Sequence, residues 1–153
     1  MKMQADLLVS PTSDKPELYS KDVLRLAAGL PHGDRLDSPD SSAVRRSPVC
    51  GSEIAVDIQA DRDGRISALA FRARACAIGQ ASAALLRVHG VGRTAAEIEE
   101  VRNFLAEALS GQEDFGQSWP ELAVFEAARA YPGRHAALLL PYDALLAALS
   151  DLN

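Results

Sequence analysis

Two cysteines, Cys50 and Cys76, are the residues of this chain best suited to hold a metal or carry sulfur. Cys50 lies in Pro48-Val49-Cys50-Gly51, where proline stiffens the chain and glycine allows a sharp turn or close backbone contact with a bound atom. Cys76 directly precedes an Ala-rich segment of helical character that lacks an ordinary polar N-cap. A thiol at a helix N-terminus lies at the positive end of the helix dipole, which favours the thiolate that binds metals. We therefore predict two reactive thiols.

Two thiols alone do not complete a site, because structural zinc and iron–sulfur clusters usually take four protein donors. Further donors would have to come from His135, Asp143 or Glu53, or from the cysteines of a second chain. A lone histidine is more often a hydrogen-bonded residue than a ligand, and His32 and His89 are weaker candidates than His135. An enzyme with a cysteine nucleophile would need a base near the sulfur, and no histidine pattern supplies one. The sequence therefore favours a carrier over an enzyme.

Composition narrows the class of protein further. The chain has 21 acidic and 16 basic residues, a net charge of −5, so binding to nucleic acid or anionic lipid is not expected. Its longest apolar runs fall far short of the roughly 20 residues needed to cross a membrane. The N-terminus lacks the apolar core and cleavage site of a secretory signal, which predicts a cytoplasmic protein with free thiols. At 153 residues the chain suits one domain.

Hydrophobic periodicity predicts an α+β fold, a three-stranded antiparallel sheet packed against helices. Residues 1–16 are expected to form a mobile leader, followed by one domain over residues 17–153. A first helix is predicted over 17–29, an edge strand over 43–49, and a hairpin of strands 53–60 and 65–73 around the turn 61–64. Helices are then predicted over 77–89, from the capping box of Thr94 and Glu97 to about 109, over 122–130, and from Pro141 to 149.

Three segments of this sequence, in this order, are similar to motifs of a known family. Residues 19–24 resemble the opening helix of the U-type iron–sulfur cluster assembly scaffolds (the NifU N-terminal, IscU and SufU-like family). Pro48-Val49-Cys50-Gly51 resembles their first cysteine motif. Residues 74–83, Arg-Ala-Cys-Ala-Ile-Gly-Gln-Ala-Ser-Ala, resemble their second, Gly-Cys-Ala-Ile-Ser-x-Ala-Ser, which is the most specific of the three. The resemblance extends from residue 18 to residue 149.

The sequence departs from the family pattern at two positions. Typical members continue the first motif as Cys-Gly-Asp, and that aspartate helps to hold the metal; Ser52 stands there in this chain, followed by Glu53. Typical members carry a third cysteine four residues before the proline of the last helix, where this chain has Ala137. A complete three-cysteine site therefore cannot form within one chain.

The resemblance implies a scaffold rather than an enzyme. It implies that Cys50 and Cys76 receive sulfur from a cysteine desulfurase, hold a transient [2Fe–2S] cluster or zinc, and pass the cluster to recipient proteins. A homodimer could pool the cysteines of two chains, or His135 or Glu53 could complete a labile site in one chain. The alternative is a degenerate paralogue that acts as an interaction or regulatory module and binds no cluster.

Overall fold

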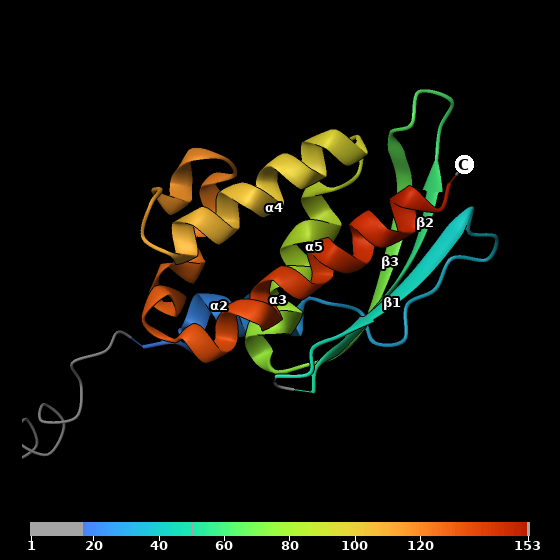
Figure 1. Ribbon diagram of the computed structural model, residues 1–153. Coiled ribbons are helices and arrows are strands. Elements are labelled where there is room, and N and C mark those ends of the chain that lie inside the picture. Colours follow the sequence, from blue (N-terminus) through green and yellow to red (C-terminus); the bar gives the residue numbers. More distant parts are fainter. Residues whose placement is uncertain (1–16, 50, 153) are drawn as a thin grey trace, which may run out of the picture.

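The computed structural model describes residues 17–49 and 51–152. The predicted leader at residues 1–16 and the predicted ligand Cys50 lie outside the described residues. The predicted α+β fold is confirmed: three strands form one antiparallel sheet, and helices pack against it (Figure 1).

The sheet has the order β1 (Ser41–Arg46), β2 (Glu53–Ala60), β3 (Ile66–Arg74), as the predicted meander requires. Its register places Val56 of β2 between Ala43 of β1 and Phe71 of β3. Because successive side chains of a strand point to opposite faces, this register gathers the large apolar residues on one face. Those of β2 and β3 that are at most 7% exposed are Ile54, Val56, Ile58, Ile66, Leu69 and Phe71.

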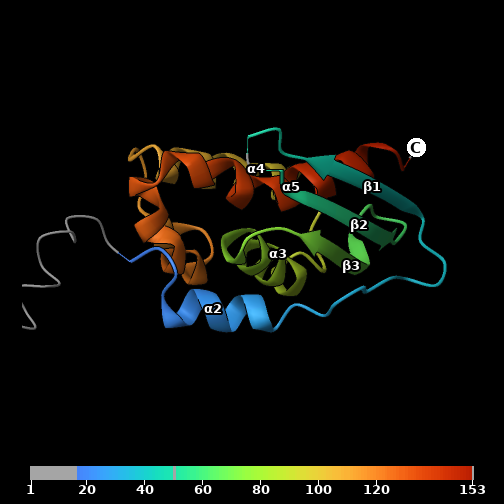
Figure 2. The same ribbon diagram turned by 90° about the horizontal axis from the view of Figure 1, so that it is seen from below.

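Two helices cover this apolar face. α3 (Ala77–His89) contacts β3, and α5 (His135–Ser150) contacts β1 and β2 as well as α3. α5 is apolar on almost every side, which is the composition of a helix buried within a core. α2 (Lys21–Ala28) lies along α3 (Figure 2), and α4 (Ala95–Leu109) packs against α5. The short turns η2 (Phe115–Gln117), η3 (Pro120–Ala130) and η4 (Pro132–Arg134) connect α4 to α5.

Several predicted element boundaries are confirmed. β2 and α3 span the predicted residues, and α4 begins with the predicted capping box, in which the Thr94 hydroxyl accepts from the Glu97 amide and the Glu97 carboxylate accepts from the Thr94 amide. The first helix is shorter than predicted because the Ser20 hydroxyl caps it by accepting from the Val23 amide. The edge strand ends at Arg46 rather than at residue 49, and the helix predicted over 122–130 is the 3₁₀ segment η3.

The prediction that the last helix begins at Pro141 is wrong. α5 begins at His135, so Pro141 lies inside it. A proline within a helix has no N–H to donate, which leaves the carbonyl of Ala137 without its helical donor. Ala137, Leu138 and Leu140 are all at most 7% exposed, and their burial stabilises the helical turn that precedes the proline.

The opposite face of the sheet carries a buried ion pair. Asp57 of β2 is 3% exposed, and its carboxylate accepts hydrogen bonds from Arg72 of β3 at 3.0 and 3.2 Å. It also accepts from the Ser42 hydroxyl of β1 at 2.7 Å and from the Leu36 amide at 3.2 Å. Burial by itself raises the pKa of Asp57, but the hydrogen bonds from Arg72, Ser42 and Leu36 outweigh it and leave the pKa below its ordinary value. One carboxylate therefore links three strands to the loop between α2 and β1.

We expect Asp57→Asn to lower the free energy of unfolding by about 2 kcal/mol at neutral pH, because the charged hydrogen bonds to Arg72 are lost. Since folding lowers the pKa of Asp57, its contribution is present above the ordinary value of 3.8 and is lost as the pH falls through the lower folded value. Urea unfolding of both proteins from neutral to acidic pH should therefore show the difference shrinking in acid. Asp37→Asn, at an exposed position, is the control. An equal loss in both variants would contradict this role for Asp57.

Candidate functional site

Cys76 occupies the N-cap of α3, as predicted from its sequence context. Its backbone is extended, with φ −68° and ψ 171°, and its carbonyl accepts the first helical hydrogen bond from the Gln80 amide at 3.0 Å. The thiol makes no capping hydrogen bond, and the residue is half-buried. The Gln80 side chain instead donates to the carbonyl of Ala75 at 2.9 Å. The sulfur thus remains available for another partner at the positive end of a thirteen-residue helix.

The loop between β1 and β2 lies at the same end of the sheet as Cys76. The register pairs Glu53, the first residue of β2, with Arg74, the last residue of β3. Within the loop, the Ser47 amide donates to the Ser52 carbonyl and the Gly51 amide donates to the Ser47 carbonyl, both at 2.8 Å. Gly51 has a φ of 73°, a conformation that favours glycine. The backbone therefore brings the two predicted cysteine motifs to one end of the sheet.

Ala137 packs against the first turn of α3. A methyl group placed on Gly79 would lie 3.9 Å from the Cβ of Ala137 and 3.5 Å from its carbonyl oxygen. Ala137 is 1% exposed. The position at which the family pattern carries its third cysteine therefore adjoins the helix that begins at Cys76. In this chain the side chain at that position cannot donate to a metal.

The three additional donors considered from the sequence differ in their availability. The Nε2 atom of His135 lies 2.8 Å from the carbonyl of Ala128, and since a carbonyl only accepts, Nε2 donates this hydrogen bond; in the neutral ring the lone pair is then on Nδ1. The Glu53 carboxylate is held by Arg46, whose Nη2 and Nε donate to it at 2.6 and 3.1 Å. A metal at Glu53 would have to displace that ion pair. Asp143 likewise accepts from Arg102 at 3.0 Å.

Over residues 17–49 and 51–152, no three His, Cys, Asp or Glu side chains lie close enough together to hold a metal ion. Cys76, His135 and Glu53 therefore do not form a three-donor cluster by themselves. The chemistry that this part of the chain offers is a single accessible thiol at a helix N-terminus.

Sequence reasoning missed how closely α3 and α5 approach beside this thiol. The Ser82 hydroxyl of α3 donates to the carbonyl of Leu138 in α5 at 2.6 Å, one residue after the carbonyl that Pro141 leaves free. Gly79 and Ser82 are small residues three apart, so they lie on one face of α3 and let the helices meet. This spacing of two small residues was the signal in the sequence from which the close approach of the helices could have been predicted. Arg72, four residues before Cys76 in the sequence, is paired with Asp57.

We expect Gly79→Ala to lower the free energy of unfolding by about 1–2 kcal/mol. The added methyl would lie 2.9 Å from the Cβ of Ala75, and this crowding outweighs the roughly 1 kcal/mol by which alanine favours a helix. Thermal unfolding monitored by circular dichroism measures the change. Gly133→Ala is the matched control, because its methyl would meet no atom within 4 Å. Equal stability of the two variants would show that Gly79 is not crowded by Ala75.

Helices that could cross a bilayer are absent from the described residues, none being both long and apolar enough.

A family model and solved structures of known proteins match both the sequence and the fold of this chain. The family model of the NifU-like N terminal domain matches residues 18–137, a range that includes both cysteines and ends at Ala137. The crystal structure of a NifU-like protein (N-terminal) from Brucella abortus is similar, with 30% sequence identity, a TM-score of 0.81, and coverage of 88% of this chain and 94% of that chain.

A second solved structure shares the fold at lower sequence identity. It is a protein from the thermophile Fervidobacterium islandicum AW-1, named an iron–sulfur cluster assembly scaffold protein for the SUF system. It has 23% identity and a TM-score of 0.78, with 86% of this chain and 96% of that chain covered. No curated protein sequence matches the chain significantly. On the family match and the Brucella structure, this chain belongs to the NifU-like N-terminal domain family.

Proposed function

We propose that the chain is an iron–sulfur cluster assembly scaffold in which Cys50 and Cys76 bind the iron and sulfide of a nascent [2Fe–2S] cluster, or zinc in its place. The observation that carries the proposal is the uncapped, half-buried thiol of Cys76 at the N-terminus of α3, next to the position of the family's third cysteine. Residues 17–153 would act as one scaffold domain in the cytoplasm. The cluster is cargo, which the chain binds and releases rather than uses for catalysis.

The donor set limits how such cargo can be held. Each chain supplies two thiols, half of the four cysteines that a [2Fe–2S] cluster usually takes. Two copies in a homodimer would supply all four. Within one chain, His135 is a better supported additional donor than Glu53, because its Nδ1 lone pair is free while Glu53 is bound by Arg46. Either arrangement binds more weakly than a complete set of ligands in one chain, which suits a cluster that must be handed to recipient proteins.

Sulfur would arrive by thiol exchange with a cysteine desulfurase. The Cys76 thiolate attacks the outer sulfur of the desulfurase persulfide, the sulfur–sulfur bond breaks, and the desulfurase thiolate leaves. The product is a persulfide on Cys76. The half-buried position of Cys76 at the end of the sheet leaves its sulfur within reach of a partner.

A second candidate function is that of an interaction module without cargo. It is favoured by Ala137 at the third cysteine position and by the absence of a three-donor cluster among residues 17–49 and 51–152. In that case neither thiol would be needed for the protein's activity. The metal content of the purified protein distinguishes the cluster scaffold from the interaction module.

Protein purified without oxygen should contain iron with acid-labile sulfide, or zinc, and both Cys50→Ser and Cys76→Ser should lose most of it, because each removes half of one chain's thiol donors. Metal analysis together with molar mass in solution measures this. One cluster per two chains would identify a shared site, whereas one per chain would identify a site completed by His135. A parent protein that stays free of metal after reconstitution with iron and a cysteine desulfurase would favour the interaction module.

Ala137→Cys should restore a third thiol and tighten zinc binding by about tenfold or more, which corresponds to at least 1.4 kcal/mol. Competition with a chromophoric zinc chelator measures the affinity. Ala144→Cys is the matched control, since Ala144 is an equally buried alanine of the same helix two turns farther from Cys76. Equal affinities in the two variants would mean that residue 137 does not face the cargo.

A further inference from the structure

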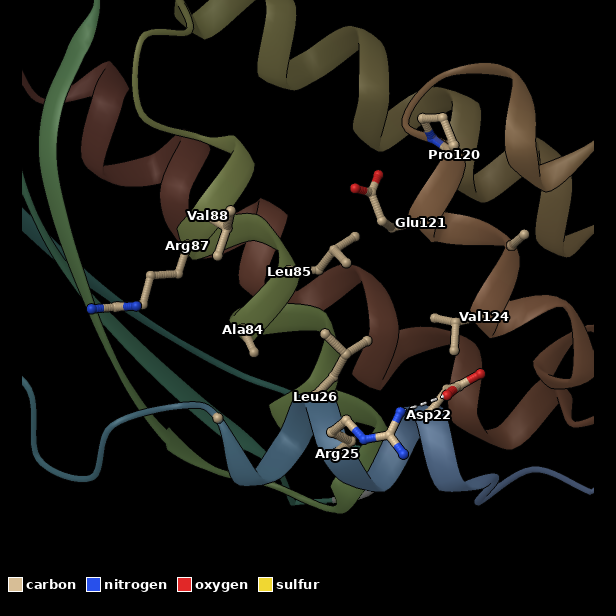
Figure 3. Close-up of a pocket in the computed structure, with 12 residues that line it drawn as sticks. Asp22, Arg25, Leu26, Ala84, Leu85, Arg87, Val88, Pro120, Glu121 and Val124 are labelled. Carbon is tan, nitrogen blue, oxygen red and sulfur yellow. Dashed lines mark hydrogen bonds and ion pairs between the residues drawn. The ribbon is translucent and has the colours of Figure 1, made fainter.

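A groove with an apolar floor runs between α2, α3 and η3, and the proposed function makes no use of it. It has a volume of about 670 Å³. The side chains of Leu26 from α2, Leu85 and Val88 from α3, and Val124 from η3 point into it (Figure 3). Val88 is 68% exposed, although it is a large apolar residue. An exposed concave surface of this kind is a binding surface rather than part of the core.

The charged residues around the groove are already paired with one another or with neighbours. Asp22 and Arg25 form an ion pair of 3.1 Å on α2, and Glu121 lies 3.4 Å from the Nε2 atom of His89. Arg87 points away from the groove, and its guanidinium lies 3.8 Å from Asp34. Each charged side chain among the described residues that line the groove therefore has a polar neighbour within 4 Å. The surface fits a short apolar segment without charges of its own.

The groove extends to the point at which the described chain begins. A second hollow of about 650 Å³ shares Ala123 and Val124 with it and is lined by Glu17 and Ser20. Glu17 is the first described residue. Sixteen residues precede it, and among them Leu7-Leu8-Val9 is the one run of three large apolar residues and carries no charge.

We propose that this groove binds Leu7-Leu8-Val9 of the same chain. Eight residues separate Leu8 from Glu17, and the chain between these two residues can span up to about 30 Å, whereas α2, which forms one wall, is about 12 Å long. Residues 10–16 contain two prolines, two serines and an aspartate, the composition of a turn, so the sequence permits the chain to reverse along α2. The covalent tether gives a local concentration on the order of millimolar, which favours this occupant over a free peptide.

The proposal gives a role to a segment expected from its composition to have little structural consequence, and it does not depend on metal binding. The test uses the full chain with carbon-13-labelled Leu and Val methyl groups. Leu8→Asp should shift the methyl resonances of Leu26, Leu85, Val88 and Val124, because a charge would be expelled from the apolar floor. Ser13→Asp adds the same charge within the same segment and should leave these resonances unchanged. Unchanged groove resonances in Leu8→Asp would overturn the proposal.

A reciprocal substitution excludes an indirect effect. Val88→Asp, at a position exposed enough to keep the fold, should shift the methyl resonances of Leu7, Leu8 and Val9, whereas Val91→Asp, exposed at the end of α3 but outside the groove, should not. Parent resonances in the groove should be independent of protein concentration. Groove resonances that change with dilution would show that a second copy fills the groove, and this outcome would also overturn the proposal.

Discussion

The close approach of α3 and α5 is the contact on which the rest of the structure depends. Gly79 of α3 lies against Ala137 of α5, and Ser82 donates to a carbonyl of α5 next to the one that Pro141 leaves without a helical donor. Ser82 is fully buried, and an unpaired buried hydroxyl would cost free energy, so its hydrogen bond to α5 ties the polar pairing of α3 to the helix contact. Both helices also cover the apolar face of the sheet. Changes in their spacing would therefore move the sheet, the N-terminus of α3 and position 137 together.

The ion pair on the other face of the sheet shows why some of the fold could not be predicted. Alternation of Ile54, Val56 and Ile58 identified β2 with the correct bounds, and the Thr94 and Glu97 pair identified the start of α4, because both signals are local. Asp57 also alternates correctly, but local sequence does not reveal that it is buried under the loop at Leu36 and matched to Arg72. The burial and pairing of Asp57 depend on the register of the strands and on the position of a loop whose residues have no regular hydrophobic pattern.

The candidate site was predictable to a similar extent. The absence of an ordinary N-cap before the Ala-rich segment placed Cys76 correctly at the start of α3, whereas the packing of Ala137 against that helix is known only from the structure. Sequence could not show that Nε2 of His135 bonds a carbonyl, since the partner, Ala128, belongs to the 3₁₀ segment η3. Nor could it show that α5 continues through Pro141, because a proline normally marks a helix start, and burial of the preceding turn overrides that preference.

The edge strand β1 limits how two copies of this chain could associate. It hydrogen-bonds to β2 on one side, and Arg45 and Arg46 are exposed near its end, with Pro48 following. Charged side chains and proline at a sheet edge oppose the addition of a further strand from another molecule. Two copies that share their cysteines would therefore meet end to end at the loops that carry these cysteines. No strand of one copy would then pair with a strand of the other. Such an arrangement can separate without breaking backbone pairing, so the bound cluster itself would hold much of the assembly together.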